Sequence, residues 1–194
     1  MRVGEENRKT SETEIFVRVN LDGEGRANIA SGIGFLNHMI NIFTKHSGFD
    51  IEIEANGDLD IDMHHTVEDI GIVLGRAINK ALGDKKGIER FGSSIIPMDE
   101  TLCMCAVDIS GRPYWVYNVP DRFNGIINRF DTELIREFII SFTNNLKANI
   151  HIQVFYGNNK HHIAEAIFKS LARALKKATR ISKDDIPSTK GVLD

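Results

Sequence analysis

The sequence predicts an α+β fold made of two copies of one strand–strand–helix–strand–helix unit, at roughly residues 9–88 and 97–178. Two observations predict this fold. The pattern His-His-x-x-Glu occurs at residues 64–68 and again at 161–165, and after each copy the apolar residues recur every three or four positions, as on one face of a helix. Segments of alternating apolar and polar residues, typical of half-buried strands, occupy matching places in the two halves.

The first unit is recognised from an alternating segment and the turn after it. Apolar residues occupy every second position from Ile15 to Leu21, and Asp22-Gly23 indicates a hairpin turn into a returning strand. Gly83 stands where the helix after the first His-His pair should stop. The expected elements are, in order, a loose polar segment at 1–9, strands at 14–21 and 26–30, a helix at 35–45, a strand at 50–55, a helix at 64–82 and a charged connector at 84–90.

A repeated spacing indicates which residues of the second unit match those of the first. Glu100-Thr101 lies eleven residues before Gly111, just as Glu12-Thr13 lies eleven residues before Gly23. The later register is also close, because Phe142-Thr143 matches Phe43-Thr44 in the first half. The expected elements are, in order, a strand at 102–107, a turn at 110–111, a strand at 114–118, an insertion at 119–130, a helix at 131–146, a strand at 150–152, a helix at 161–178 and a polar tail at 179–194.

Neither unit could bury its apolar surface by itself. Each would leave one face of its sheet and two amphipathic helices uncovered. We therefore expect the two halves to pack helix against helix, with the sheets outside, in one domain over residues 1–194 with internal pseudo-two-fold symmetry.

The composition narrows the classes of function. The chain is 42% hydrophobic and 26% charged with a net charge of −3, so no basic surface predicts nucleic-acid binding. An apolar run of about 18 residues, which a membrane span needs, is missing from the sequence, as is a signal-peptide pattern. Cys103 and Cys105 share one face of a strand and are expected to be buried thiols, not a metal pair. We expect a cytoplasmic protein with a small-molecule partner.

The two His-His-x-x-Glu patterns predict metal binding. Residues three and four apart share a helix face, so Glu68 can join His64 or His65, and Glu165 can join either histidine of its own pair. Adjacent helical positions point about 100° apart. One His-His pair is therefore better suited to serving two sites than one.

The repeat predicts one further ligand in each half. His38 lies five residues before Phe43, and Glu137 lies five residues before Phe142. The two expected ligand sets are His38, His64, His65 and Glu68 in the first half, and Glu137, His161, His162 and Glu165 in the second. These nitrogen and oxygen donors suit two divalent ions that keep positions for water or substrate. His151 matches Glu52 and is expected to lie outside the site, whereas His46 could cap its helix or lean into the site.

Spacing by itself leaves several functions open. A dinuclear metal site also fits a metallohydrolase that acts on phosphate esters with metal-bound hydroxide. A structural shell, in which metal joins subunits, and two solvated helix starts are the non-enzymatic alternatives.

Longer stretches of the chain match one enzyme family. They are Glu12-Thr13, 20–23, 32–39, 62–71, 90–92, 97–100, 110–113, 161–166, Phe168-Lys169 and 188–191. Through these stretches the sequence resembles imidazoleglycerol-phosphate dehydratase, the dehydratase of histidine biosynthesis, over essentially its whole length.

The resemblance implies a fold and an assembly. The fold is a helical layer between two mixed sheets, as in the ribosomal protein S5 domain 2-like class, without the phosphatase domain fused to some relatives. The assembly is an octahedral 24-subunit homo-oligomer with active sites between subunits, each holding two manganese ions. Many relatives carry a metal-binding histidine where Glu137 stands, and a carboxylate at this position is still expected to bind manganese.

The resemblance also implies a reaction, the removal of water from D-erythro-imidazole-glycerol phosphate to give imidazole-acetol phosphate. We expect the substrate imidazole to lie between the two ions, which stabilise the charge that builds up. Glu12 is the expected proton shuttle, and its repeat mate Glu100 is the second choice.

Binding of the phosphate requires cations and hydroxyl donors. The resemblance assigns to the phosphate pocket Arg90, Arg112, Lys169, Ser188 and Lys190. Our expected substrate-binding residues also include Glu12, His46 and Thr189. The polar tail is expected to become ordered over the ligand.

Overall fold

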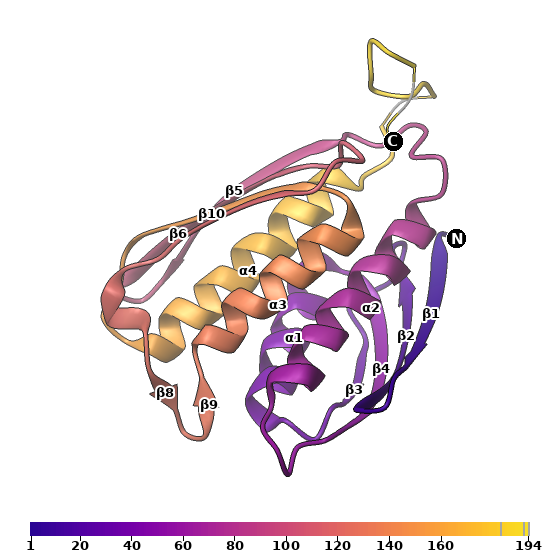
Figure 1. Cartoon of the computed structure of the whole chain (residues 1–194). Coiled ribbons are helices and arrows are strands. Elements are labelled where there is room, and N and C mark those ends of the chain that lie inside the picture. The colour runs from indigo at the N-terminus through magenta and orange to yellow at the C-terminus, as the bar shows by residue number, and fades with distance from the viewer. Residues whose placement is uncertain (183, 192, 194) are drawn as a thin grey trace.

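The computed structural model describes residues 1–182, 184–191 and 193. Within these residues, two four-stranded sheets lie on the outside of a layer of four α-helices (Figure 1). Each sheet is covered on its inner face by the helices of its own half. The predicted α+β sandwich, with helices packed against helices, is confirmed.

The first half contains six elements. They are β1 (Val3–Lys9), β2 (Thr13–Asn20), β3 (Ala27–Ala30), α1 (Gly34–Ser47), β4 (Asp50–Gly57) and α2 (His64–Leu82). The strand order in the sheet is β1-β2-β4-β3, and β3 runs parallel to β4 while the other pairs are antiparallel.

The second half repeats this order with an insertion. Its elements are β5 (Phe91–Met98), β6 (Thr101–Asp108), β7 (Tyr114–Asn118), the 3₁₀ turn η1 (Asp121–Phe123), β8 (Ile126–Ile127), β9 (Phe130–Asp131), α3 (Glu133–Leu146), β10 (Asn149–Tyr156) and α4 (Lys160–Ala178). The sheet order β5-β6-β10-β7 matches that of the first half. The inserted β8–β9 hairpin extends beyond the sandwich in Figure 1.

Each of the two main sheets has one strand more than the sequence predicted. Residues 1–9 were expected to be loose, but β1 pairs with β2 along its length, and β5 pairs with β6 in the same way. Gly4 and Gly92 occupy equivalent places where these strands meet the helices. A Cβ atom on Gly4 would lie 2.0 Å from the Ala77 carbonyl oxygen, and one on Gly92 would lie 2.0 Å from that of Ala174. A side chain larger than glycine would therefore not fit at either place. The inner face of β1 continues with the polar residues Glu6 and Arg8, which pair with Lys80 and Asp69 of α2.

The predicted hairpin at Asp22-Gly23 is wrong. β4 lies between β2 and β3, so β3 joins the sheet through a β3-α1-β4 crossover instead of folding back on β2. The Asp50 side chain accepts the backbone N–H groups of Glu24 and Arg26, both at 2.9 Å. These bonds tie the loop after β2 to the start of β4.

The helical layer joins the two halves. α1 packs against α4, and α2 packs against α3, so each contact pairs a helix of one half with a helix of the other. Phe43 and Phe142, which the repeat places at equivalent positions, meet with ring centroids 6.2 Å apart. Among the described residues, no helix is long and apolar enough to cross a membrane.

Candidate metal centre and substrate site

Both His-His pairs lie in the first turn of a helix. The Asn159 side chain caps α4 by accepting the His161 N–H at 2.9 Å, and the Asp62 side chain accepts the His64 N–H at 2.7 Å. Such side chains satisfy N–H groups that have no partner within the helix. The sequence thereby fixes where each helix begins and which way its histidines point.

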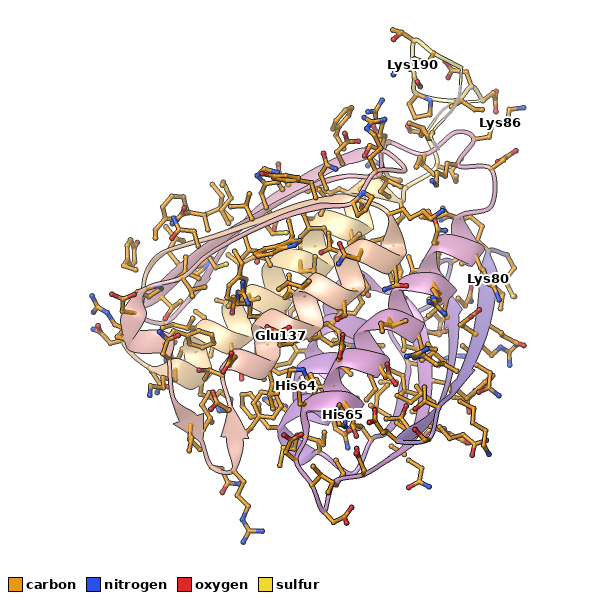
Figure 2. The ribbon with its side chains drawn as sticks, in the orientation of Figure 1. His64, His65, Lys80, Lys86, Glu137 and Lys190 are labelled. Atoms are coloured by element: carbon orange, nitrogen blue, oxygen red, sulfur yellow. The ribbon has the colours of Figure 1, made fainter. Side chains whose placement is uncertain are left out.

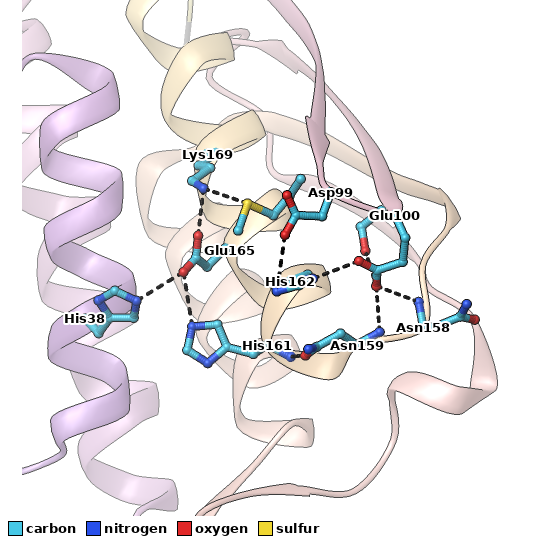
Figure 3. Close-up of polar contacts among 11 residues, drawn as sticks. His38, Asp99, Glu100, Asn158, Asn159, His161, His162, Glu165 and Lys169 are labelled. Carbon is cyan, nitrogen blue, oxygen red and sulfur yellow. Dashed lines mark hydrogen bonds and ion pairs between the residues drawn. The ribbon is translucent and has the colours of Figure 1, made fainter.

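Three predicted ligands come together at one end of the helical layer. His38 from α1, with His161 and Glu165 from α4, offers nitrogen and oxygen atoms that all lie within 4.8 Å of one another (Figure 3). The Glu165 carboxylate is 3.2 Å from His38 Nε2 and 3.1 Å from His161 Nε2. This arrangement of two imidazoles and a carboxylate is suited to a divalent ion.

The grouping of these ligands differs from the expected sets. His38 was grouped with His64, His65 and Glu68 of its own half, but the structure places it beside the second-half motif. The reason is the packing of the helices, because α1 packs mainly against α4 of the other half. One candidate metal site, the cluster of His38, His161 and Glu165, is therefore built from both halves of the chain.

Glu165 is the electrostatic centre of this cluster. Its burial would raise the pKa of the carboxyl group, but hydrogen bonds from Lys169, His38 and His161 outweigh burial and lower the pKa to about 2. The Lys169 ammonium lies 2.6 Å from the second carboxylate oxygen. Glu165 is therefore ionised and ready to bind a cation at physiological pH.

The second histidine of the α4 pair has a different set of partners. His162 Nδ1 lies 2.8 Å from Glu100, in the loop between β5 and β6, and its Nε2 lies 3.7 Å from Asp99 (Figure 3). The hydrogen bond to Glu100 raises the pKa of His162. Glu100 also accepts the backbone N–H groups of Asn158 and Asn159, at 3.1 and 2.7 Å, and these bonds hold its pKa well below the usual range.

In the first half, the two adjacent histidines also have different partners. His64 Nε2 lies 3.9 Å from Glu68, one helical turn later. His65 Nδ1 lies 2.9 Å from Asp58 and 3.7 Å from Glu12, in the loop between β1 and β2. The hydrogen bond to Asp58 raises the pKa of His65. Asp58 was not singled out from the sequence, because it lies in a polar loop outside the repeated motif.

Glu137 is the equivalent of His38 in the second half. It lies on α3, which packs against α2, and Figure 2 shows it near the end of the helical layer where His64 and His65 start α2. Its carboxylate is 3.0 Å from the Arg136 guanidinium. The pseudo-symmetry thus matches the cluster of His38, His161 and Glu165 with a second group, Glu137, His64 and Glu68.

The two remaining histidines differ in their surroundings. Burial lowers the pKa of the His46 imidazole, and the positive charges of Lys169 and Arg173 on α4 lower it further. His151 lies on β10 with its ring 6.1 Å from that of Tyr114, away from both His-His pairs.

The residues assigned to the phosphate do not lie together. Arg90 donates to both Asp108 oxygens, at 2.7 and 3.2 Å, and to the Pro187 carbonyl at 3.0 Å. Arg112 is close by, because Asn149, the partner of Asp108 in the sheet, donates to its carbonyl at 2.6 Å. Lys169 instead belongs to the metal cluster.

Residues 188–190 form a turn near Arg90. The Lys190 N–H donates to Ser188 Oγ, and the Gly191 N–H donates to the Ser188 carbonyl. Thr189 and Lys190 are exposed. Figure 2 shows Lys190 at the opposite end of the molecule from His64 and His65. Within a single chain, Arg90 and Arg112 therefore lie apart from Lys169.

Comparison with known proteins identifies the family. The model of the imidazoleglycerol-phosphate dehydratase family matches residues 31–175. The imidazoleglycerol-phosphate dehydratase of Azorhizobium caulinodans is 53% identical over 196 residues, covering 100% of this chain and 99% of that protein. The Clostridium kluyveri enzyme is 51% identical over 195 residues, covering 100% of both.

Solved structures agree with this match. The dehydratase of Staphylococcus aureus superposes with a TM-score of 0.83 at 40% identity, over 93% of this chain and 99% of that one. The enzyme of Pyrococcus furiosus gives a TM-score of 0.84 at 39% identity, over 97% of this chain and 100% of the other. The chain therefore belongs to the imidazoleglycerol-phosphate dehydratase family, the dehydratases of histidine biosynthesis.

Proposed function

We propose that the chain removes water from D-erythro-imidazole-glycerol phosphate, in a manganese-dependent site that is completed by a second subunit. The observation that carries this proposal is the cluster of His38, His161 and Glu165, in a chain that belongs to the dehydratase family. Members of a family of dehydratases are expected to share the reaction, and the cluster supplies the donors that a metal ion needs.

The donor chemistry of both groups fits a divalent ion. His38, His161 and Glu165 would hold one ion with two nitrogens and one oxygen. The equivalent group of Glu137, His64 and Glu68 has one nitrogen and two oxygens, and oxygen-rich sites suit manganese. His65 and His162 face away from these groups toward Glu12 and Glu100, so we propose that they complete sites formed with neighbouring subunits.

The reaction breaks a C–H and a C–O bond on neighbouring carbons of the substrate. Bound metal would stabilise the negative charge that the substrate imidazole carries when its ring N–H proton is lost. This charge would help to expel the hydroxyl group from the carbon next to the ring, and the ring regains its N–H proton as the double bond forms. We assign Glu12 to proton transfer, because its carboxylate is half-exposed and lies 3.7 Å from His65 Nδ1. The electron pair of the C–H bond forms the double bond of an enol. The departing hydroxyl takes up a proton and leaves as water, and the enol becomes the ketone.

The distance between the two ends of α4 favours an active site that is shared between subunits. His161 lies at the start of the helix, whereas the Arg90 N–H donates to the carbonyl of Ala178 at its end. A helix of this length spans about 27 Å. A small phosphorylated substrate cannot reach both ends of one chain. We therefore propose that Arg90, Arg112 and residues 188–190 of one subunit bind the phosphate of a substrate held at the metal cluster of another.

This sharing is consistent with the expected 24-subunit shell, which we retain as part of the proposal. We also propose a cytoplasmic location. Cys103 and Cys105 are both free and buried, as is usual for proteins in a reducing compartment.

The deciding experiment is to incubate the metal-depleted protein with the substrate, with and without added Mn²⁺. Mass spectrometry should show a product lighter by one water only when manganese is present. Release of inorganic phosphate would instead indicate the metallohydrolase. An assembly that depends on manganese but forms no product would indicate the structural shell.

A further inference from the structure

A buried hydrogen-bond network holds the β1–β2 hairpin, whose loop carries Glu12, against α2. Thr10 Oγ1 accepts the N–H groups of Glu12 and Thr13, at 3.1 and 3.0 Å. The buried Thr13 hydroxyl donates to Asp69 Oδ2 at 2.5 Å, and Arg8 Nε donates to Asp69 Oδ1 at 2.8 Å. Asp69 lies in α2, next to the His-His-x-x-Glu motif. The network therefore fixes the hairpin relative to the helix that carries the first-half histidines.

The second half forms the matching hairpin without this network. Ala166 stands at the position equivalent to Asp69, and Ile96 stands at the position equivalent to Arg8. The strand pairing of β5 with β6 is nevertheless as regular as that of β1 with β2. A hairpin of this fold can thus form without a buried aspartate beneath it.

The two halves hold their equivalent glutamates in opposite ways. The Glu100 carboxylate accepts two backbone N–H groups and contacts His162, so the side chain itself is held in place. The Glu12 carboxylate contacts His65 at 3.7 Å, and the backbone beneath it is what the network holds. This arrangement positions Glu12 while leaving its carboxylate available to exchange protons.

Stability does not explain why a charged group is buried here. Asp69 is only 6% exposed, and the loss of hydration of a buried ion pair largely cancels the attraction between its charges. We therefore attribute the buried charge of Asp69 to the fixed position that it gives the β1–β2 hairpin.

We propose that Asp69 and Thr13 are positioning residues that hold Glu12 at the reacting carbon. This inference rests on the proposed role of Glu12 in proton transfer. Neither residue is placed to touch substrate, because both side chains are buried between the β1–β2 hairpin and α2 and bond to each other. Their effect on the reaction passes through the place of the Glu12 carboxylate.

The first test substitutes the buried hydroxyl. Thr13→Val should lower kcat by roughly 10- to 100-fold, since displacement of a catalytic group by about 1 Å has effects of this size. KM and manganese content should stay near those of the wild type, and Thr13→Ser should restore most of kcat. Thr143→Val is the matched control, because the Thr143 side chain is also buried and its hydroxyl donates to the Ile139 carbonyl within α3. Unchanged kcat in Thr13→Val would overturn the proposal.

The second test is a double-mutant cycle with Glu12→Gln. If Thr13 acts through Glu12, adding Thr13→Val to the Glu12→Gln variant should lower kcat further by less than about threefold. Equal losses in both backgrounds would show that Thr13 acts by another route and would overturn the proposal.

A third measurement separates this inference from the proposed function. Hydrogen exchange in the manganese-loaded protein should be faster in Thr13→Val for residues 8–14, and unchanged for the matching residues 96–102. Unaltered exchange at residues 8–14 would reject the positioning role even if Glu12 is catalytic. Faster exchange together with a fully active Glu12→Gln variant would reject the role of Glu12 and leave the anchoring of the hairpin intact.

Discussion

At the scale of single residues, adjacent histidines at the start of α2 and α4 face different partners. His161 contacts Glu165, one turn along the same helix, while His162 contacts Glu100 in a loop between strands. In the same way, His64 lies near Glu68 on its own helix, while His65 contacts Asp58 in a loop. Neighbouring positions on a helix point about 100° apart, so one pair presents ligands in two directions.

Glu12→Gln should remove proton transfer while preserving metal content and assembly. The amide has nearly the same size but cannot accept and return a proton at neutral pH, and losses of about 10²- to 10⁴-fold are typical for such groups. Measurement of kcat alongside manganese content and size-exclusion chromatography tests this expectation. Near-normal turnover would remove Glu12 from the mechanism.

Glu137→Ala should lower the manganese content of the purified protein. The pseudo-symmetry places Glu137 in the group with His64 and Glu68, so its loss should reduce binding from about two ions per chain toward one. Elemental analysis after dialysis measures this. Glu133→Ala, on the same helix one turn earlier and exposed, serves as the control. Full occupancy in Glu137→Ala would contradict its assignment as a ligand.

The sequence identified the three clustered ligands but not their grouping. The histidine pairs are visible as motifs, and the repeat led to His38. The contact of His38 with Glu165, 127 positions later, depends on which helices pack together across the two halves. Periodicity shows which face of a helix is apolar but does not say which helix will cover it.

At the scale of elements, β1 and β5 show where the sequence pattern is misleading. β5 turns Phe91 and Ile95 outward, and its buried positions are Gly92 and Ser94. β1 is polar throughout, apart from Val3 and a buried glycine. Strand prediction looks for large apolar residues on the inner face, but the helices lie so close to Gly4 and Gly92 that only glycine fits there, and β1 continues this face with Glu6 and Arg8.

Asp22→Asn should weaken the attachment of β1 in a pH-dependent way. Side-chain hydrogen bonds from Arg2 lower the pKa of Asp22 below its ordinary value of 3.8. The carboxylate therefore stabilises the fold above that value, and the stabilisation is lost as the pH falls through the lowered folded-state pKa.

At pH 7 the melting temperature of Asp22→Asn should be roughly 1–3 °C below that of the wild type, as expected for an exposed ion pair. The difference should shrink as the pH falls below 3.8 and should disappear once the Asp22 carboxyl group is protonated in the folded state as well. Asp184→Asn, an exposed carboxylate in the tail, is the control. A difference that persisted unchanged at acidic pH would show that the ion pair is not its cause.

At the scale of the whole molecule, the residues that we propose for metal binding and those that we propose for phosphate binding lie at opposite ends of α4. This separation predicts that subunits with different defects can complement each other. Glu165→Gln should disable the metal cluster, and Arg112→Ala should weaken phosphate binding, so each variant assembled by itself should be nearly inactive.

Co-assembly of the two variants should restore activity. If each site takes its metal ligands from one subunit and its arginines from another, about one quarter of the sites in an equal mixture combine intact parts. The activity of co-expressed, doubly tagged assemblies measures this. A mixture no more active than the sum of its components would show that one chain supplies the entire site.

The path of the chain also has a consequence for its connectivity. Arg2 Nη1 donates to the Thr179 carbonyl at 2.6 Å, so β1 begins beside the end of α4. In the other half, residues 83–90 join the end of α2 to the start of β5. A circularly permuted gene that opened the chain within 83–90 and linked Thr179 to Arg2 should therefore encode the same sandwich, with the order of its halves exchanged.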